Sequence, residues 1–122
     1  MKKILFIEDE SALQQAVSQV LGERGFETLV ALDGNLGIAL AKKEIPDLIL
    51  LDLILPQKNG FDVLNELKKD ESTKHIPIII LTNLEESRDV ERAIALGATT
   101  YLVKTNYKLE EVVEKIKSIL GE

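Results

Sequence analysis

The sequence predicts an α/β fold in which a parallel, doubly wound five-stranded sheet is covered by helices on both faces. Short aliphatic runs alternate along the chain with segments of helical periodicity, and strict alternation of this kind is typical of parallel sheets. Two of the runs, Leu48–Leu51 and Ile78–Leu81, contain no polar residue. Strands that are buried on both faces have this composition, whereas strands with one solvated face alternate between apolar and polar residues.

The first strand and the first helix are expected before residue 26. The aliphatic run Lys3–Ile7 predicts a strand. Ser11 is the expected N-cap of the helix that follows. This helix has one apolar face at spacings of three and four residues, made by Leu13, Ala16, Val17, Val20 and Leu21. Gly22 and Gly25 are expected to end it.

Two further strand and helix pairs occupy the middle of the chain. Glu27–Ala31 predicts the second strand, and the turn Asp33-Gly34 starts a helix. The apolar spacing of that helix is set by Leu36, Ala39 and Leu40. Pro46 ends it before the third strand, and Gly60 then precedes a third helix. The residues expected to point inward from this helix are Phe61, Leu64 and Leu67.

The last part of the chain repeats the pattern. Pro77 leads into the fourth strand, and Gly97 closes a fourth helix. The apolar residues of that helix are Val90, Ala93 and Ile94. Thr100–Val103 predicts the fifth strand. The final helix is amphipathic, with Leu109, Val112, Val113, Ile116 and Leu120 on one face.

Composition excludes several classes of function. The length of 122 residues predicts one domain spanning residues 1–122. With 15 basic and 21 acidic residues, no Trp and 4% aromatic residues, direct nucleic-acid binding is disfavoured. The absence of Cys excludes disulfides, thiol catalysis and thiolate zinc sites. The apolar run after Lys2-Lys3 is shorter than a signal peptide or a membrane span requires. We therefore expect a cytoplasmic protein with no membrane insertion.

Four of the predicted strands end in polar residues, and ligands of a doubly wound sheet bind beyond these strand ends. Glu8 and Asp9 follow the first strand, Asp52 follows the third, Thr82 ends the fourth and Lys104 follows the fifth. Right-handed crossovers place these four strands side by side. Three carboxylates that converge there repel one another, and oxygen ligands without His or Cys favour Mg²⁺.

Each of these residues also has a purely structural explanation. Glu8 and Asp9 precede a helix and fit capping roles equally well. Thr82 taken alone fits an ordinary strand residue, and Lys104 taken alone fits a solvated surface charge. Asp52 is harder to explain in this way, because it follows four aliphatic residues and an unpaired charge in apolar surroundings is costly.

Spaced motifs over essentially the whole chain resemble the receiver domain of bacterial two-component response regulators, in particular the single-domain chemotaxis regulators. The motifs are Ile4–Glu10, Pro46–Asp52, Leu55-Pro56, Asn59–Phe61, Pro77–Thr82, Leu96–Ala98 and Tyr101–Lys104. Each is weak alone, but their combined spacing is specific. The resemblance implies a flavodoxin-like (βα)5 sandwich with the strand order 2-1-3-4-5.

The resemblance also implies the chemistry of the site. Asp52 would take a phosphoryl group from a phosphohistidine, while Lys104 and Thr82 contact the phosphoryl oxygens. Such a transfer needs positioning and charge neutralisation more than covalent assistance. Thr82 and Tyr101 would act as a switch, in which the tyrosine turns inward when the threonine moves.

The implied cofactor is Mg²⁺. Asp9, Asp52 and the backbone carbonyl of Ile54 would bind it directly, and Glu8 would contribute through water. The implied partners are a sensor histidine kinase or a histidine phosphotransfer protein, and a downstream effector protein. The domain would catalyse its own phosphorylation without being a turnover enzyme, as a monomer or a weak dimer.

The sequence departs from the family pattern at several positions. Thr105 replaces the proline that commonly follows the lysine, and Asn83 replaces a small residue after Thr82. Ile54 and Leu84 are apolar at the two positions that flank the phosphate, which predicts a long-lived phosphoryl group because neither can orient a water molecule. Thr99-Thr100 replaces the paired acids that members with winged-helix domains use in a dimer.

The expected docking surface for the kinase surrounds the entrance to Asp52. It comprises the start of the first helix and the loop after Lys104. The residues expected to contribute are Leu13, Gln14, Val17, Thr105, Asn106 and Tyr107.

Three other functions are found on this architecture, and the residues of this chain argue against the first two. A hydrolase with an Asp nucleophile needs a second Asp two residues later, and Ile54 stands there. A flavin- or nucleotide-binding domain needs a loop rich in glycine or hydroxyl groups after the first strand, and Glu8-Asp9-Glu10 has the wrong charge. A degenerate receiver would bind partners without phosphorylation, an alternative that Thr105 keeps open.

Overall fold

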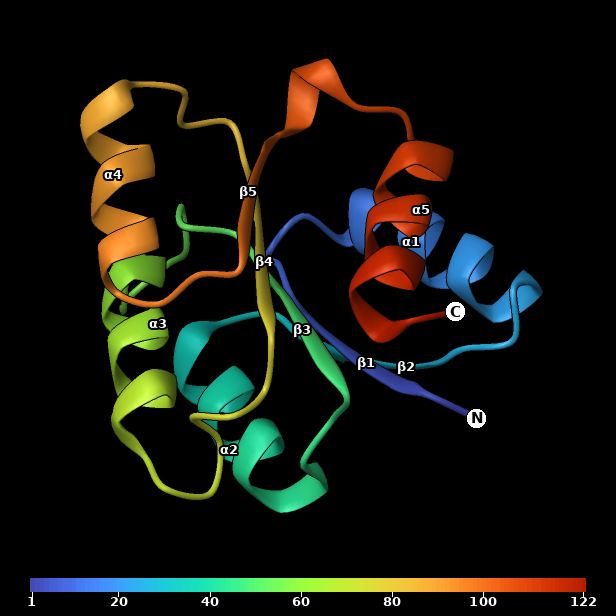
Figure 1. Cartoon of the computed structure of the whole chain (residues 1–122), viewed down its shortest axis with the longest axis horizontal. Coiled ribbons are helices and arrows are strands. Elements are labelled where there is room, and N and C mark those ends of the chain that lie inside the picture. Colours follow the sequence, from blue (N-terminus) through green and yellow to red (C-terminus); the bar gives the residue numbers. More distant parts are fainter.

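A computed structural model describes residues 1–122 and contains five strands and five α-helices in strict alternation, as predicted (Figure 1). The strands are β1 (Lys3–Ile7), β2 (Glu27–Ala31), β3 (Leu48–Leu51), β4 (Ile78–Thr82) and β5 (Thr100–Val103). The α-helices are α1 (Ser11–Glu23), α2 (Gly34–Glu44), α3 (Gly60–Lys69), α4 (Ser87–Ala95) and α5 (Leu109–Leu120). A short 3-10 helix, η1 (Lys104–Asn106), follows β5 and was not predicted.

The sheet is parallel throughout and has the predicted strand order β2-β1-β3-β4-β5. Figure 1 shows α1 and α5 on one face, with α2, α3 and α4 on the other. The register places Ile7 beside Leu51, Leu51 beside Ile80, and Ile80 beside Tyr101. The carboxyl ends of four strands therefore lie together at one edge of the sheet.

Each face of the sheet has its own apolar core, because alternate residues of a strand point to opposite faces. Leu5 and Ile7 pack with the residues of α2 and α3, whereas Ile4 and Phe6 pack with those of α1 and α5. All four residues of Leu48–Leu51 are fully buried. The prediction that the central strands are covered on both faces is confirmed.

The predicted apolar spacing of α2 does not describe the face that this helix buries. Leu36 is 45% exposed, and the buried residues of the helix are Gly34, Gly37, Ile38 and Ala41. The reason is a close approach to β1, since a Cβ atom at Gly37 would lie 2.5 Å from Cδ1 of Ile7. Because Gly37 has no side chain, α2 lies directly on β1, the strand that precedes Glu8. A large apolar residue at this position would not fit.

Ser11 is not the N-cap of α1, contrary to the prediction. The cap is Glu10, which forms no side-chain capping bond, and Ser11 is the first helical residue. The first helical bond runs from the Gln14 amide to the Glu10 carbonyl at 3.0 Å, so the helix begins one residue earlier than expected. The bond between Lys104 and Thr105 is trans, as are all peptide bonds of the chain. None of the helices combines the length and apolar character that crossing a membrane requires.

Candidate functional site

The three acidic residues predicted to converge do so at the carboxyl edge of the sheet. One carboxylate oxygen from each of Glu8, Asp9 and Asp52 lies within 4.8 Å of those of the other two. Glu8 and Asp52 are buried, whereas Asp9 is exposed. This arrangement confirms that the strand ends bring the acids together, and it leaves one carboxylate accessible to solvent.

The backbone holds the buried acids in place by extending the strand ladders one residue further. The Glu8 amide donates to the carbonyl of Ala31 at 2.9 Å, and the Asp52 amide donates to the carbonyl of Ile7 at 3.1 Å. Gly60 adds a third constraint, because a Cβ atom there would lie 2.4 Å from the carbonyl oxygen of Asp52. The start of α3 therefore packs directly against the chain that carries Asp52.

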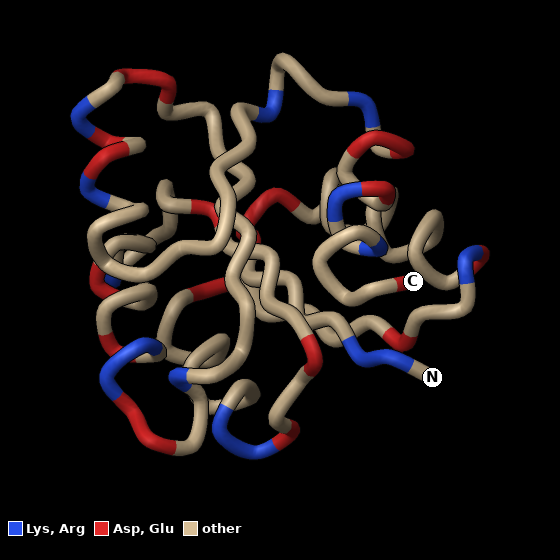
Figure 2. The backbone as a smooth tube through the Cα atoms, in the orientation of Figure 1, with Lys and Arg blue, Asp and Glu red and all other residues tan.

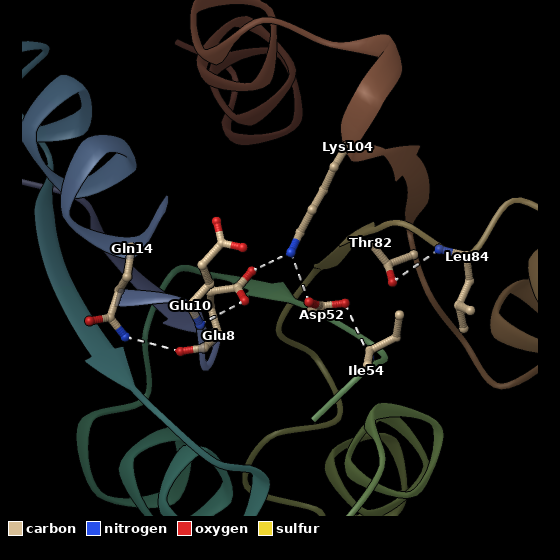
Figure 3. Close-up of polar contacts among 8 residues, drawn as sticks. All are labelled: Glu8, Glu10, Gln14, Asp52, Ile54, Thr82, Leu84 and Lys104. Carbon is tan, nitrogen blue, oxygen red and sulfur yellow. Dashed lines mark hydrogen bonds and ion pairs between the residues drawn. The ribbon is translucent and has the colours of Figure 1, made fainter. Parts of the chain in front are cut away.

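Lys104 connects the two buried carboxylates (Figure 3). Its Nζ lies 2.8 Å from Oε1 of Glu8 and 2.9 Å from Oδ2 of Asp52. The side chain of Lys104 is 14% exposed, while those of Glu8 and Asp52 are 1% and 4% exposed. The alternative explanation of Lys104 as a solvated surface charge is therefore wrong.

The electrostatics of this cluster leave negative charge uncompensated. Burial raises the pKa of Glu8 above its ordinary value, although the contact with Lys104 acts against this. Burial acts to lower the pKa of Lys104, but its bonds to Glu8 and Asp52 outweigh burial and raise it. Three carboxylates against one ammonium group leave a net charge of −2, which matches the charge of a divalent cation.

The carboxylate of Asp52 is held from both sides. Oδ1 accepts a hydrogen bond from the Ile54 amide at 3.1 Å, while Oδ2 faces Lys104. The side chain of Ile54 itself is exposed. In Figure 3, Asp52 lies between Glu8 on one side and Thr82 on the other. Asp52 is therefore oriented by the two groups bonded to it.

Thr82 and Tyr101 are linked through a single residue, Leu84. The Leu84 amide donates to Oγ1 of the fully buried Thr82 over 3.5 Å, and the Tyr101 hydroxyl donates to the Leu84 carbonyl at 2.9 Å. Burial, followed by the charges of Asp89 and Asp52, raises the pKa of Tyr101 to about 12. The tyrosine is thus a half-buried, neutral hydroxyl donor that bonds to the loop between β4 and α4.

The structure gives Gln14 a role that its sequence pattern did not predict. It was expected on the docking surface, but it is only 8% exposed, and its side-chain amide donates to the Glu8 carbonyl at 3.2 Å. Val17, expected on the same surface, is also buried. Gln14 lies three residues before Val17 and seven before Leu21, and all three are buried. The spacing of Gln14 on this apolar face is the signal that identifies it as an inward residue.

Comparison with known proteins places this chain in a family. The family model of the response regulator receiver domain matches residues 4–117. The chain belongs to the response regulator receiver domain family. Of the residues described above, Glu8, Asp9, Asp52, Thr82 and Lys104 all lie within the matched segment. Receiver domains are signalling modules that interact with other proteins of a two-component system.

Two curated relatives and one solved structure show how close the similarity is. The chain is 39% identical over 120 residues to the DNA-binding dual master transcriptional regulator RpaA of Synechocystis, covering 98% of this chain and 49% of RpaA. It is 36% identical over 121 residues to protein PilH of Pseudomonas aeruginosa, covering 99% of each chain. It superimposes on the Mn²⁺-bound form of response regulator Rcp1 with a TM-score of 0.85 and 34% identity, covering 97% of this chain and 93% of that one. The chain spans about half the length of RpaA and nearly all of PilH.

Proposed function

We propose that this receiver domain accepts a phosphoryl group on Asp52 from a phosphohistidine, and that the new phosphate changes how the domain binds a downstream protein. The observation that carries the proposal is the convergence of four strand ends on one carboxylate. Asp52 is buried, oriented by the Ile54 amide and paired with Lys104. A carboxylate that is held in one orientation by its neighbours is a competent nucleophile for phosphoryl transfer.

The residues around Asp52 fit a divalent cation. The net charge of −2 and the exclusively oxygen donor set suit Mg²⁺ better than a softer metal. Asp9 and Asp52 would hold it together with the Ile54 carbonyl, and Glu8 would contribute through water. When bound, Mg²⁺ neutralises part of the negative charge on the transferring phosphoryl group. The Mn²⁺-bound state of Rcp1 supports a divalent cation in this family.

The transfer itself uses the residues of this chain. A carboxylate oxygen of Asp52 forms a bond to phosphorus while the P–N bond of the phosphohistidine breaks and its electron pair returns to the imidazole ring. The ammonium group of Lys104 leaves Glu8 and moves to a phosphoryl oxygen, because the phosphate carries more charge than the carboxylate did. The Thr82 hydroxyl donates to another phosphoryl oxygen. The product is an aspartyl phosphate with its charge compensated on two sides.

The response to phosphorylation passes through the loop that follows β4. When Thr82 turns toward the phosphate, its bond from the Leu84 amide breaks, and Leu84 loses one of its two hydrogen bonds. The Tyr101 hydroxyl remains bonded to the Leu84 carbonyl, so the loop and the tyrosine move together. A local change in charge is thereby transmitted to the surface around α4.

The proposed partners follow from where the site opens. A sensor histidine kinase or a histidine phosphotransfer protein would dock beside Asp52, on the half-buried Leu13 of α1 and on the exposed Thr105 and Asn106 of η1. A downstream effector protein would respond to the phosphorylated form. Figure 2 shows Lys and Arg interleaved with Asp and Glu along α4 and α5, which suits a protein partner better than a nucleic-acid backbone. We propose a monomer or a weak dimer, because Thr99-Thr100 lacks the acids of the family's dimer.

The test is incubation with acetyl phosphate and Mg²⁺, followed by intact mass. The wild type is expected to gain one phosphate, and Asp52→Asn is expected to gain none. Asp47→Asn serves as the matched control, because Asp47 is an exposed aspartate just before β3, at the opposite end of the strand from Asp52, and it should take up phosphate normally. Full phosphate uptake by Asp52→Asn would refute the assignment. Absence of uptake by the wild type would instead favour a phosphorylation-independent interaction module.

A further inference from the structure

The turn between β1 and α1 contains a backbone carbonyl that the sheet does not satisfy. Glu8 is fully buried, and its amide donates to Ala31 as the last bond of the β1–β2 ladder. In a parallel ladder the next donor, to the Glu8 carbonyl, would be the Asp33 amide. However, β2 ends at Ala31 and Asp33 becomes the N-cap of α2, so this bond is not formed.

Gln14 supplies the missing donor and holds the turn at both ends. Its side-chain amide donates to the Glu8 carbonyl at 3.2 Å, and its backbone amide donates to the Glu10 carbonyl at 3.0 Å. The Glu10 amide in turn donates to Oε2 of Glu8 at 3.1 Å. Asp9 lies between these two fixed residues and is exposed. Its position therefore depends on a backbone that is held at Glu8 by the Gln14 side chain (Figure 3) and at Glu10 by the Gln14 amide.

We infer that Gln14 is a positioning residue, which shapes the Glu8–Glu10 turn so that Glu8, Asp9 and Asp52 share one cation. This inference rests on the proposed magnesium site. Side chains that orient metal ligands without touching the metal typically change metal affinity by about 10- to 100-fold. Because Gln14 does not contact Asp52 or Lys104, it sets the affinity for Mg²⁺ without taking part in the transfer.

The informative substitution is Gln14→Met, since methionine has nearly the same length and volume but no N–H donor. The rate of phosphorylation by acetyl phosphate is measured as a function of Mg²⁺ concentration, and Mg²⁺ binding is measured directly by calorimetry. We expect the half-saturating Mg²⁺ concentration and the dissociation constant to rise about tenfold. The rate at saturating Mg²⁺ should change by less than about twofold, because the reacting groups are untouched.

Two control variants separate positioning from loss of stability. Gln15→Met alters the next residue of the same helix, which is exposed, and should leave every value unchanged. Val17→Ala removes buried apolar contacts from the same helix, so it should lower the melting temperature without moving the half-saturating Mg²⁺ concentration. If the role of Gln14 is purely structural, Gln14→Met will behave like Val17→Ala. It will lower the melting temperature and leave the half-saturating Mg²⁺ concentration unchanged.

A measurement on the metal-free protein tests the anchoring itself. Hydrogen exchange at the Glu10 amide, which donates to Oε2 of Glu8, should accelerate about tenfold in Gln14→Met relative to the amides of β3, because the turn loses one of its fixed ends. If the wild type binds Mg²⁺ and Gln14→Met shows the same affinity, the inference fails and the magnesium site stands. If the wild type binds no Mg²⁺, the proposed site fails and the inference fails with it.

Discussion

Replacing Lys104 by methionine is the perturbation that tests the electrostatics of the site most directly. Methionine keeps much of the length of the side chain but removes the ammonium group that contacts Glu8 and Asp52. Both carboxylates are at least 96% buried, so in the metal-free protein they lose their only cationic partner. Removing one partner of a buried ion pair costs about 3–5 kcal/mol. Because Lys104 is partly exposed, we expect about 3 kcal/mol.

The expected size of the effect follows from the length of the chain. The entropy of unfolding is roughly 2 cal/mol/K per residue, so for a domain of this length each 1 kcal/mol lowers the melting temperature by about 4 °C. Lys104→Met should therefore melt about 12 °C below the wild type in metal-free buffer at pH 8. Mg²⁺ should raise the melting temperature of the variant more than that of the wild type, because the cation no longer competes with the lysine for the acids.

The effect should also depend on pH in a defined direction. Burial already raises the pKa of Glu8 above its ordinary value of 4.5, and loss of Lys104 removes a contact that opposed this. A carboxyl whose pKa is raised by folding binds more protons in the folded state, so the free energy of unfolding falls as pH rises through that range. The destabilisation by Lys104→Met should consequently be smaller at pH 5 than at pH 8.

The assay is thermal denaturation followed by circular dichroism, with and without Mg²⁺, at both pH values. Lys115→Met on the exposed side of α5 is the control for loss of one positive charge. Adding Glu8→Gln to Lys104→Met should recover more than half of the lost stability, because it removes one of the stranded charges. A melting temperature for Lys104→Met within about 2 °C of the wild type at pH 8 would refute the reasoning.

Three further predictions concern positions away from Lys104. Exchanging both apolar flanking residues, Ile54→Asn with Leu84→Glu, should speed loss of the phosphoryl group about 10- to 100-fold, because the new polar groups orient a water molecule. The rate is measured as the decay of phosphorylated protein after acetyl phosphate is removed, and decay of the wild type within seconds would contradict the prediction. Ile45 is a β-branched residue with φ of 43° at the C-cap of α2. Glycine adopts this left-handed conformation without strain, so Ile45→Gly should stabilise the fold by about 1 kcal/mol. A lower melting temperature for the variant would count against this. Asn106→Glu should slow transfer from a phosphohistidine protein about tenfold while leaving the acetyl phosphate reaction unchanged, since Asn106 is exposed on η1; equal slowing with both donors would mean that Asn106 acts on the chemistry.

The sequence by itself determined the elements and the location of the site. Strand and helix bounds follow from apolar periodicity, which reflects the two side-chain repeats that the backbone imposes. The aliphatic run before Asp52 identified a central strand, and the rule for strand ends placed Glu8, Asp9, Thr82 and Lys104 at the same edge. These predictions needed no distances, because neighbouring parallel strands end at one side of a sheet.

Only the tertiary structure decided which atoms meet. The buried face of α2 depends on Gly37, whose contact with Ile7 is invisible to a search for large apolar residues. The periodicity of α1 places Gln14 on the buried face, but its bond to the Glu8 carbonyl depends on where the ladder between β1 and β2 ends. The bond of Tyr101 to Leu84 likewise spans 17 residues. Polar contacts of this kind depend on the geometry of the assembled fold, whereas apolar periodicity is local to each segment.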